Sequence, residues 1–91
     1  MEKVSTTGIE NYTEKIGNDG AVMNIRVETT QEGKLINAPV KKDKIELAVL
    51  ARQQDGKIIL MVRAGVEMTK EEFFDLFKKS AEVISELTDV K

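Results

Sequence analysis

The sequence contains no cysteine, no histidine and no tryptophan. Without cysteine or histidine there is no disulfide framework, no thiol nucleophile, no zinc site built on these residues and no side chain that is the usual general base at neutral pH. Aromatic residues are also few: they are Tyr12, Phe73, Phe74 and Phe77, and the three phenylalanines lie within five positions of one another. These absences exclude most familiar kinds of catalytic and metal site.

Long apolar runs are also missing, so we expect no membrane span. Residues 1–5 lack the apolar core of a signal peptide, and the cytoplasm is therefore the expected compartment. The net charge of −2 argues against a general nucleic-acid binder. What remains, 41% apolar and 33% charged residues, is typical of an ordinary globular domain.

Residues 1–19 are polar and are interpreted as an N-terminal arm that precedes a single domain at 20–91. Ile9, Tyr12 and Ile16 recur at the spacing of a helix face, so the arm is either a short helix or docked segment, or a frayed terminus. The residues leave both interpretations open.

Residues 21–29 alternate between apolar and polar side chains, which predicts a strand with one wet face. The Glu32-Gly33 pair can close a hairpin to residues 35–40, pairing Val27 with Ala38 and Ile25 with Val40. Because Pro39 has no N–H to donate, this second strand is expected to lie at a sheet edge or to end at that residue. Residues 41–44 are expected to form a charged connection.

Asp55-Gly56 is a strong signal for a hairpin with a two-residue turn between residues 45–53 and 57–63. That turn places Leu50 opposite Met61. One face of the hairpin then carries Leu47, Val49, Ala51, Ile58, Leu60 and Val62, and the other carries Ala48, Leu50, Ile59 and Met61, framed by Arg52 and Arg63. One helix can cover only one of these faces, so the second needs another cover.

Thr69 and Glu72 have the spacing of a capping box, which predicts a helix that runs to about Leu87. Its apolar side chains span an arc of about 180°, wider than a helix resting on one sheet requires. The expected fold class is α+β: an antiparallel sheet of about four strands, in the order ββββα, with the C-terminal amphipathic helix on one face.

The densest group of carboxylates is Glu71, Glu72 and Asp75, which we interpret as helix-start charges on a solvated face. Ser80 and Ser85 have no base nearby in the sequence to activate them. No phosphate-binding loop or dinucleotide fingerprint is present. The chain is therefore expected to be non-enzymatic, with no cofactor and no metal.

Basic residues could form a stripe on the sheet that binds single-stranded nucleic acid: Arg26, Lys42, Lys44, Arg52 and Arg63. Such binders usually add aromatic platforms on which bases stack, and the predicted strands contain no aromatic residue. Nucleic-acid binding is therefore the second hypothesis rather than the first.

Residues 65–73, Gly-Val-Glu-Met-Thr-Lys-Glu-Glu-Phe, are similar to the strand-to-helix junction of the positive-cofactor type transcriptional coactivators. The resemblance covers about nine of the 91 residues. It implies a small dimeric protein with four strands and one helix that binds single-stranded DNA. The sheet aromatics and basic loops of that family are missing here, so the resemblance is an analogy of architecture.

The favoured hypothesis is a small binding or assembly module that forms a homodimer or joins a larger complex. The expected contact residues are Leu50, Ile59, Met61 and Phe74. The N-terminal arm, through Ile9, Tyr12 and Ile16, is the alternative cover for the second face. The size and composition would also suit a phage or mobile-element accessory protein that inhibits or docks on a host protein.

Overall fold

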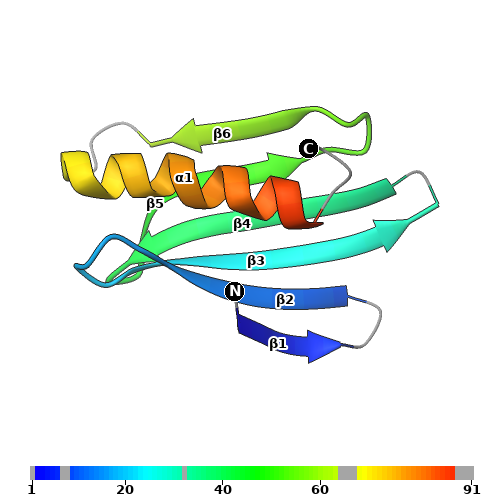
Figure 1. Cartoon of the computed structure of the whole chain (residues 1–91), viewed down its shortest axis with the longest axis horizontal. Coiled ribbons are helices and arrows are strands. Elements are labelled where there is room, and N and C mark those ends of the chain that lie inside the picture. The colour runs from blue at the N-terminus through cyan, green and yellow to red at the C-terminus, as the bar shows by residue number, and fades with distance from the viewer. Residues whose placement is uncertain (1, 7–8, 32, 64–67, 88–91) are drawn as a thin grey trace.

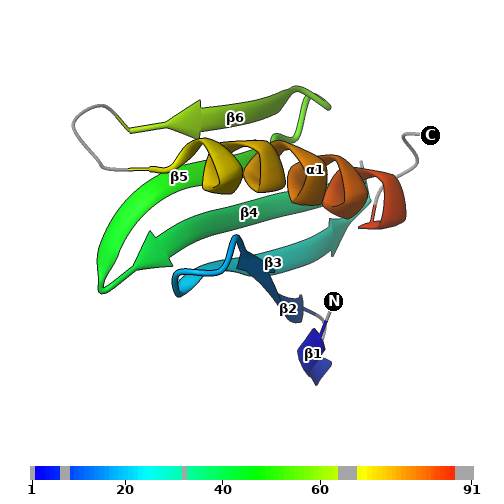
Figure 2. The same ribbon diagram turned by 60° about the vertical axis from the view of Figure 1, so that its left-hand side comes forward.

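The computed structural model describes residues 2–6, 9–31, 33–63 and 68–87. Its strands form one antiparallel sheet in which each strand pairs with the next along the chain, and one helix follows them. The elements are β1 (Glu2–Thr6), β2 (Ile9–Ile16), β3 (Ala21–Thr30), β4 (Gly33–Lys42), β5 (Ile45–Arg52), β6 (Ile58–Val62) and α1 (Lys70–Leu87). The helix lies on one face of the sheet (Figures 1 and 2). The predicted α+β class and the antiparallel sheet are confirmed, and the described residues form six strands where about four were expected.

The two additional strands come from the segment interpreted as an arm. Residues 9–16 pair with β3 along their whole length, with Tyr12 opposite Ile25 and Ile16 opposite Ala21. Ile16 is fully buried and Tyr12 packs against the core. The helical spacing was misleading, because Ile9 lies an odd number of positions from Tyr12 and so falls on the other face of the strand.

The β3–β4 hairpin is tighter than predicted, with Thr30 opposite Gly33 and Val27 opposite Ile36. The register differs from the prediction by two positions, so every side chain stays on its expected face. The expectation for Pro39 is wrong: β4 lies between β3 and β5. The β3–β4 pairs stop at Met23–Val40 and resume at Arg26–Asn37, so the ladder is interrupted around the residue that lacks an N–H.

The β4–β5 connection is shorter than predicted, because Lys41 and Lys42 belong to β4. Asp43 and Lys44 both have positive φ, 51° and 68°, as the two central residues of a type I′ turn require. The register shifts between Val40–Ala48 and Lys41–Glu46. Leu47 is the extra residue of this bulge, and both it and Ala48 are buried.

The helix begins where the capping box predicts. The Thr69 N–H donates to Glu72 Oε1 at 3.0 Å, and the Glu72 N–H donates to Thr69 Oγ1 at 3.1 Å. Between helix and sheet lies the core: Ile16, Ala21, Met23, Ile25, Val27, Ile36, Ala38, Val40, Leu47, Ala48, Leu50, Leu76, Val83, Ile84 and Leu87. Among the described residues no helix is both long enough and apolar enough to span a bilayer.

The β2–β3 turn docks on the start of the helix. Gly17 has φ +66°, and its N–H donates to Asp75 Oδ2 at 2.6 Å. A Cβ at this position would lie 2.8 Å from Glu72 Cγ, closer than carbon atoms approach without displacement. The backbone conformation therefore favours glycine here, and the buried glutamate beneath it leaves no room for a Cβ.

Gly17→Ala should destabilise the fold more than Gly20→Ala, by about 1–3 kcal/mol for the added overlap. Gly20 is the matched control, because its φ is also positive, +92°, while no atom of the described residues lies within 4 Å of the position that a Cβ would occupy there. Urea denaturation of the two variants gives the difference. Equal losses would mean that Glu72 moves aside without penalty.

Candidate functional site

The β5–β6 hairpin has a three-residue turn. The Gln53 N–H donates to the Lys57 carbonyl at 2.8 Å, and the Gly56 N–H donates to the Gln53 carbonyl at 2.9 Å. Gly56 has φ +86°, as in the bulged turn in which a type I turn is followed by a left-handed residue. The predicted two-residue turn is wrong by one residue, because Gln54 belongs to the turn together with Asp55 and Gly56.

That one residue changes which side chains share a face. Leu50 lies opposite Leu60, and Val49 lies opposite Met61. Leu50 is only 1% exposed and belongs to the core under the helix, so its predicted place on the outer face is wrong. Ile59 and Met61 are on the face away from the helix, as neighbours of Ala51 and Val49.

Apolar side chains lie on both faces of the hairpin, as predicted. Relative to β5, however, each side chain of β6 lies on the face opposite to the predicted one. Every position of β6 is apolar and none is fully buried. Ile58 is 40% exposed and Met61 57% exposed, while Leu60 and Val62 pack partly against the core. β6 is also an edge strand of the sheet that the described residues form.

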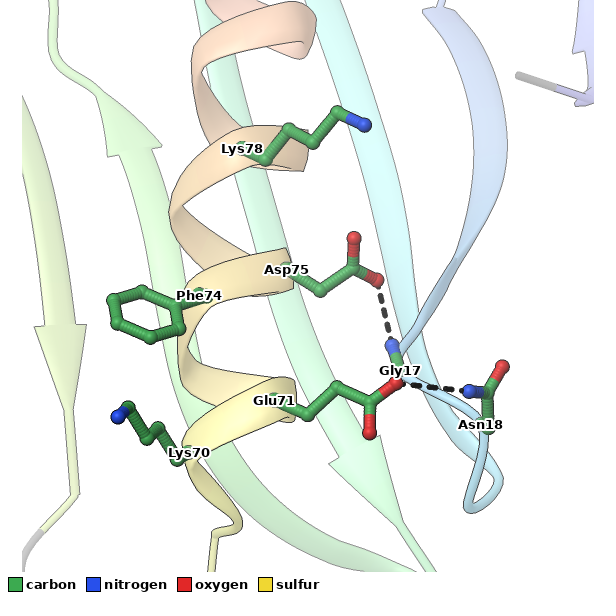
Figure 3. Close-up of a pocket in the computed structure, with 7 residues that line it drawn as sticks. All are labelled: Gly17, Asn18, Lys70, Glu71, Phe74, Asp75 and Lys78. Atoms are coloured by element: carbon green, nitrogen blue, oxygen red, sulfur yellow. Dashed lines mark hydrogen bonds between the residues drawn. The ribbon is translucent and has the colours of Figure 1, made fainter.

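The flank of α1 that faces β6 carries the phenylalanines. Phe73 is 37%, Phe74 62% and Phe77 50% exposed. The centres of the Phe73 and Phe77 rings lie 5.1 Å apart, and Lys70 Nζ lies 5.7 Å from the centre of the Phe74 ring. Phe74 points away from the β2–β3 turn (Figure 3).

The helix starts at the end of the sheet where β6 stops and runs back alongside it (Figures 1 and 2). The apolar side chains of the strand and of the neighbouring helix flank therefore border one edge of the molecule. We call this set the edge surface: Ile58, Leu60, Met61, Val62, Phe73, Phe74 and Phe77. Sequence reasoning found Met61 and Phe74 and missed the others, although the wide apolar arc of the helix was a signal for Phe73 and Phe77.

The opposite flank of α1 is polar and is tied to β2 and the β2–β3 turn. The Asn18 side-chain N–H donates to Glu71 Oε1 at 3.0 Å, and Asp75 accepts from Gly17 (Figure 3). Lys79 Nζ lies 3.0 Å from Glu14 Oε1, and this hydrogen bond raises the pKa of Lys79. A hollow of about 630 Å³ opens beside these contacts.

The interpretation of the helix-start carboxylates as solvated charges therefore needs correction. Glu71 and Asp75 are exposed or half-buried, but each holds a residue of the turn. Glu72 is only 1% exposed, and its Oε2 lies 3.5 Å from Lys42 Nζ of β4. The hydrogen bond from the Thr69 N–H is the main reason why the pKa of Glu72 lies below its ordinary value, and Lys42 adds to the effect.

Ser80 and Ser85, the two serines considered in the sequence, both lie on α1. The Ser80 hydroxyl is buried and has no hydrogen-bond partner among the described residues, and Ser85 is exposed on the helix. The described residues contain no group of three or more acidic, histidine or cysteine side chains that could hold a metal ion.

The five basic candidates for nucleic-acid binding do not gather on one surface. Arg26 lies on the sheet face away from the helix, whereas Lys42 pairs with Glu72 on the helix side. Arg52 donates to the Lys34 carbonyl, and Arg63 Nε donates to Glu46 Oε2 at 2.6 Å. Lys44 lies in the β4–β5 turn. A continuous basic stripe is not formed by these residues.

Comparison with known proteins finds no matching family model, and no match among curated proteins or solved structures. The first part of the junction that is similar to the positive-cofactor coactivators, residues 65–67, lies outside the described part of the chain.

Glu72 should make the fold sensitive to acid. Its folded-state pKa is lower than the ordinary 4.5, so its contribution to stability is complete above about pH 4.5 and is lost as the pH falls through the folded-state pKa. Glu72→Gln should flatten the dependence of the unfolding free energy on pH below about pH 5, where a difference of one bound proton corresponds to about 1.4 kcal/mol per pH unit.

The matched control is Glu71→Gln, which removes one carboxylate from the exposed side of the same helical turn. Urea denaturation at a series of pH values gives both slopes. An unchanged slope in Glu72→Gln would contradict the role assigned to this carboxylate.

Proposed function

We propose that the protein is a small non-enzymatic assembly module that works as a homodimer, with the edge surface as its contact. One observation carries the proposal. Of the large apolar side chains that are exposed among the described residues, all but Ile45 belong to β6 or to the neighbouring flank of α1. A concentration of exposed apolar side chains along one edge of a small domain is typical of an interaction site.

The composition of the edge surface supports the proposal. Phenylalanine and methionine are enriched in the centres of protein interfaces, where charged residues are depleted. The phenylalanines bring large apolar areas, and Met61 adapts its shape to an imperfect neighbour. The charged residues that flank β6 in the sequence, Lys57 and Arg63, stand at the two ends of the strand, and Arg63 pairs with Glu46.

The alternative in which the N-terminal segment covers the hairpin finds no support. Tyr12 and Ile16 are committed to the helix-facing core on β2. β2 and β6 are separated by three strands of the sheet (Figure 1). A cover for the edge surface must therefore come from outside the described residues, and a second copy of the chain supplies a surface of the same apolar character.

Met61→Lys should weaken the dimer by about tenfold or more, because it places two charges, one from each copy, in an apolar contact. Light scattering over a range of protein concentrations measures the change. Ile45→Lys is the matched control, since Ile45 is 58% exposed against 57% for Met61 but lies outside the edge surface. A wild-type chain that is monomeric at every concentration, or equal effects of both changes, would contradict the proposal.

A further inference from the structure

The free side of β6 presents a regular set of backbone groups. The Lys57 carbonyl accepts from Gln53, and the Arg63 N–H donates to the Leu47 carbonyl at 3.0 Å. Backbone groups of successive residues point to opposite sides of a strand, so the odd-numbered residues bond to β5. Ile58, Leu60 and Val62 therefore direct their N–H and C=O groups outward, away from the sheet.

Resting on the proposed function, we infer that the partner is a second copy bound by antiparallel pairing of β6 with β6, with Leu60 at the twofold axis. Two copies in this register place Leu60 opposite Leu60 and Ile58 opposite Val62 of the second copy. All three outward-facing residues then exchange both backbone hydrogen bonds. If the register shifts by two residues, one outward-facing residue of β6 in each copy has no β6 residue opposite it to accept or donate its backbone hydrogen bonds.

The side chains of β6 are self-complementary in the same register. Ile58, Leu60 and Val62 meet their counterparts on the helix side. On the other face Ile59 lies opposite Met61 of the second copy, so every cross-strand pair within β6 is apolar. Natural edge strands usually carry a charge, a proline or a bulge that prevents such pairing, and Ile58–Val62 contains no charge and no proline.

The helices fit this arrangement. A twofold axis perpendicular to the joined sheet places both copies of α1 on the same face. Their phenylalanine flanks, with Phe73 and Phe77, then face each other across the β6–β6 junction. The flank tied to β2 points outward in both copies. The inferred dimer therefore uses the strand and the helix flank together.

One contact in this register is unfavourable and gives a sharp test. Lys57 lies opposite Arg63 of the second copy, and like charges at opposed positions oppose pairing. Lys57→Glu converts both symmetry-related contacts to opposite charges and should tighten the dimer about tenfold. Lys34→Glu makes the same change of charge on exposed β4 and should leave the affinity unchanged. A weakened or unaltered dimer in Lys57→Glu would overturn the register.

Disulfide trapping tests the geometry directly, because the natural chain has no cysteine. Leu60→Cys should form a covalent dimer under mild oxidation, since opposed residues of a hydrogen-bonded pair have Cα atoms about 5.5 Å apart, within the range of a disulfide. Ile58→Cys alone and Val62→Cys alone should not, because the two copies of each residue are about 13 Å apart. A mixture of these two variants should form a covalent heterodimer.

The outcomes separate this inference from the proposed function. Covalent dimers of Leu60→Cys and of the mixture support the twofold pairing of β6. A wild-type dimer in light scattering without these products means that the copies associate through another part of the edge surface, so the strand pairing is wrong and the proposed function stands. A wild-type chain that is monomeric would contradict both the strand pairing and the proposed function. Lys57→Glu keeps the test decisive if Leu60→Cys, at a partly buried position, fails to fold.

Discussion

Glu72 connects three parts of the fold through one buried carboxylate. It completes the capping box with Thr69, its second oxygen lies beside Lys42 of β4, and its side chain fills the space under Gly17. A buried charge is tolerated only where hydrogen bonds and an opposite charge replace its hydration, and these partners come from the helix start and the centre of the sheet. The position of the helix on the sheet depends on this contact.

Other contacts of the helix explain why its two flanks differ. Hydrogen bonds from Gly17 and Asn18, and the Lys79–Glu14 pair, hold α1 on the side of β2. A helix held there cannot also cover the last strand of a six-stranded sheet. β6 and the facing helix flank are left with their apolar side chains exposed, so the edge surface follows from how the helix is anchored.

Much of this fold could be predicted because its signals are local. The capping box, the helix end near Leu87 and the alternation of β3 depend on residues close together in the sequence. The site was less predictable, because Asp55-Gly56 fits both a two-residue and a three-residue turn. Whether Gln54 belongs to the strand or to the turn decides whether Leu50 is buried, and no local feature distinguishes the two cases. Pro39 and residues 9–16 were misjudged for a related reason: their places in the sheet depend on pairing with β3, and such a tertiary contact overrides propensity and spacing.

The meander order gives the sheet two edges of unlike composition. The β1 edge has the sequence Glu-Lys-Val-Ser-Thr, and the β6 edge has Ile-Ile-Leu-Met-Val. Pairing between unlike edges would extend from copy to copy without limit, as in a fibre, whereas pairing of like edges about a twofold axis closes on itself. In the proposed dimer, pairing of like edges therefore gives a complex of fixed size, because the β6 edge of each copy is occupied by the β6 edge of the other.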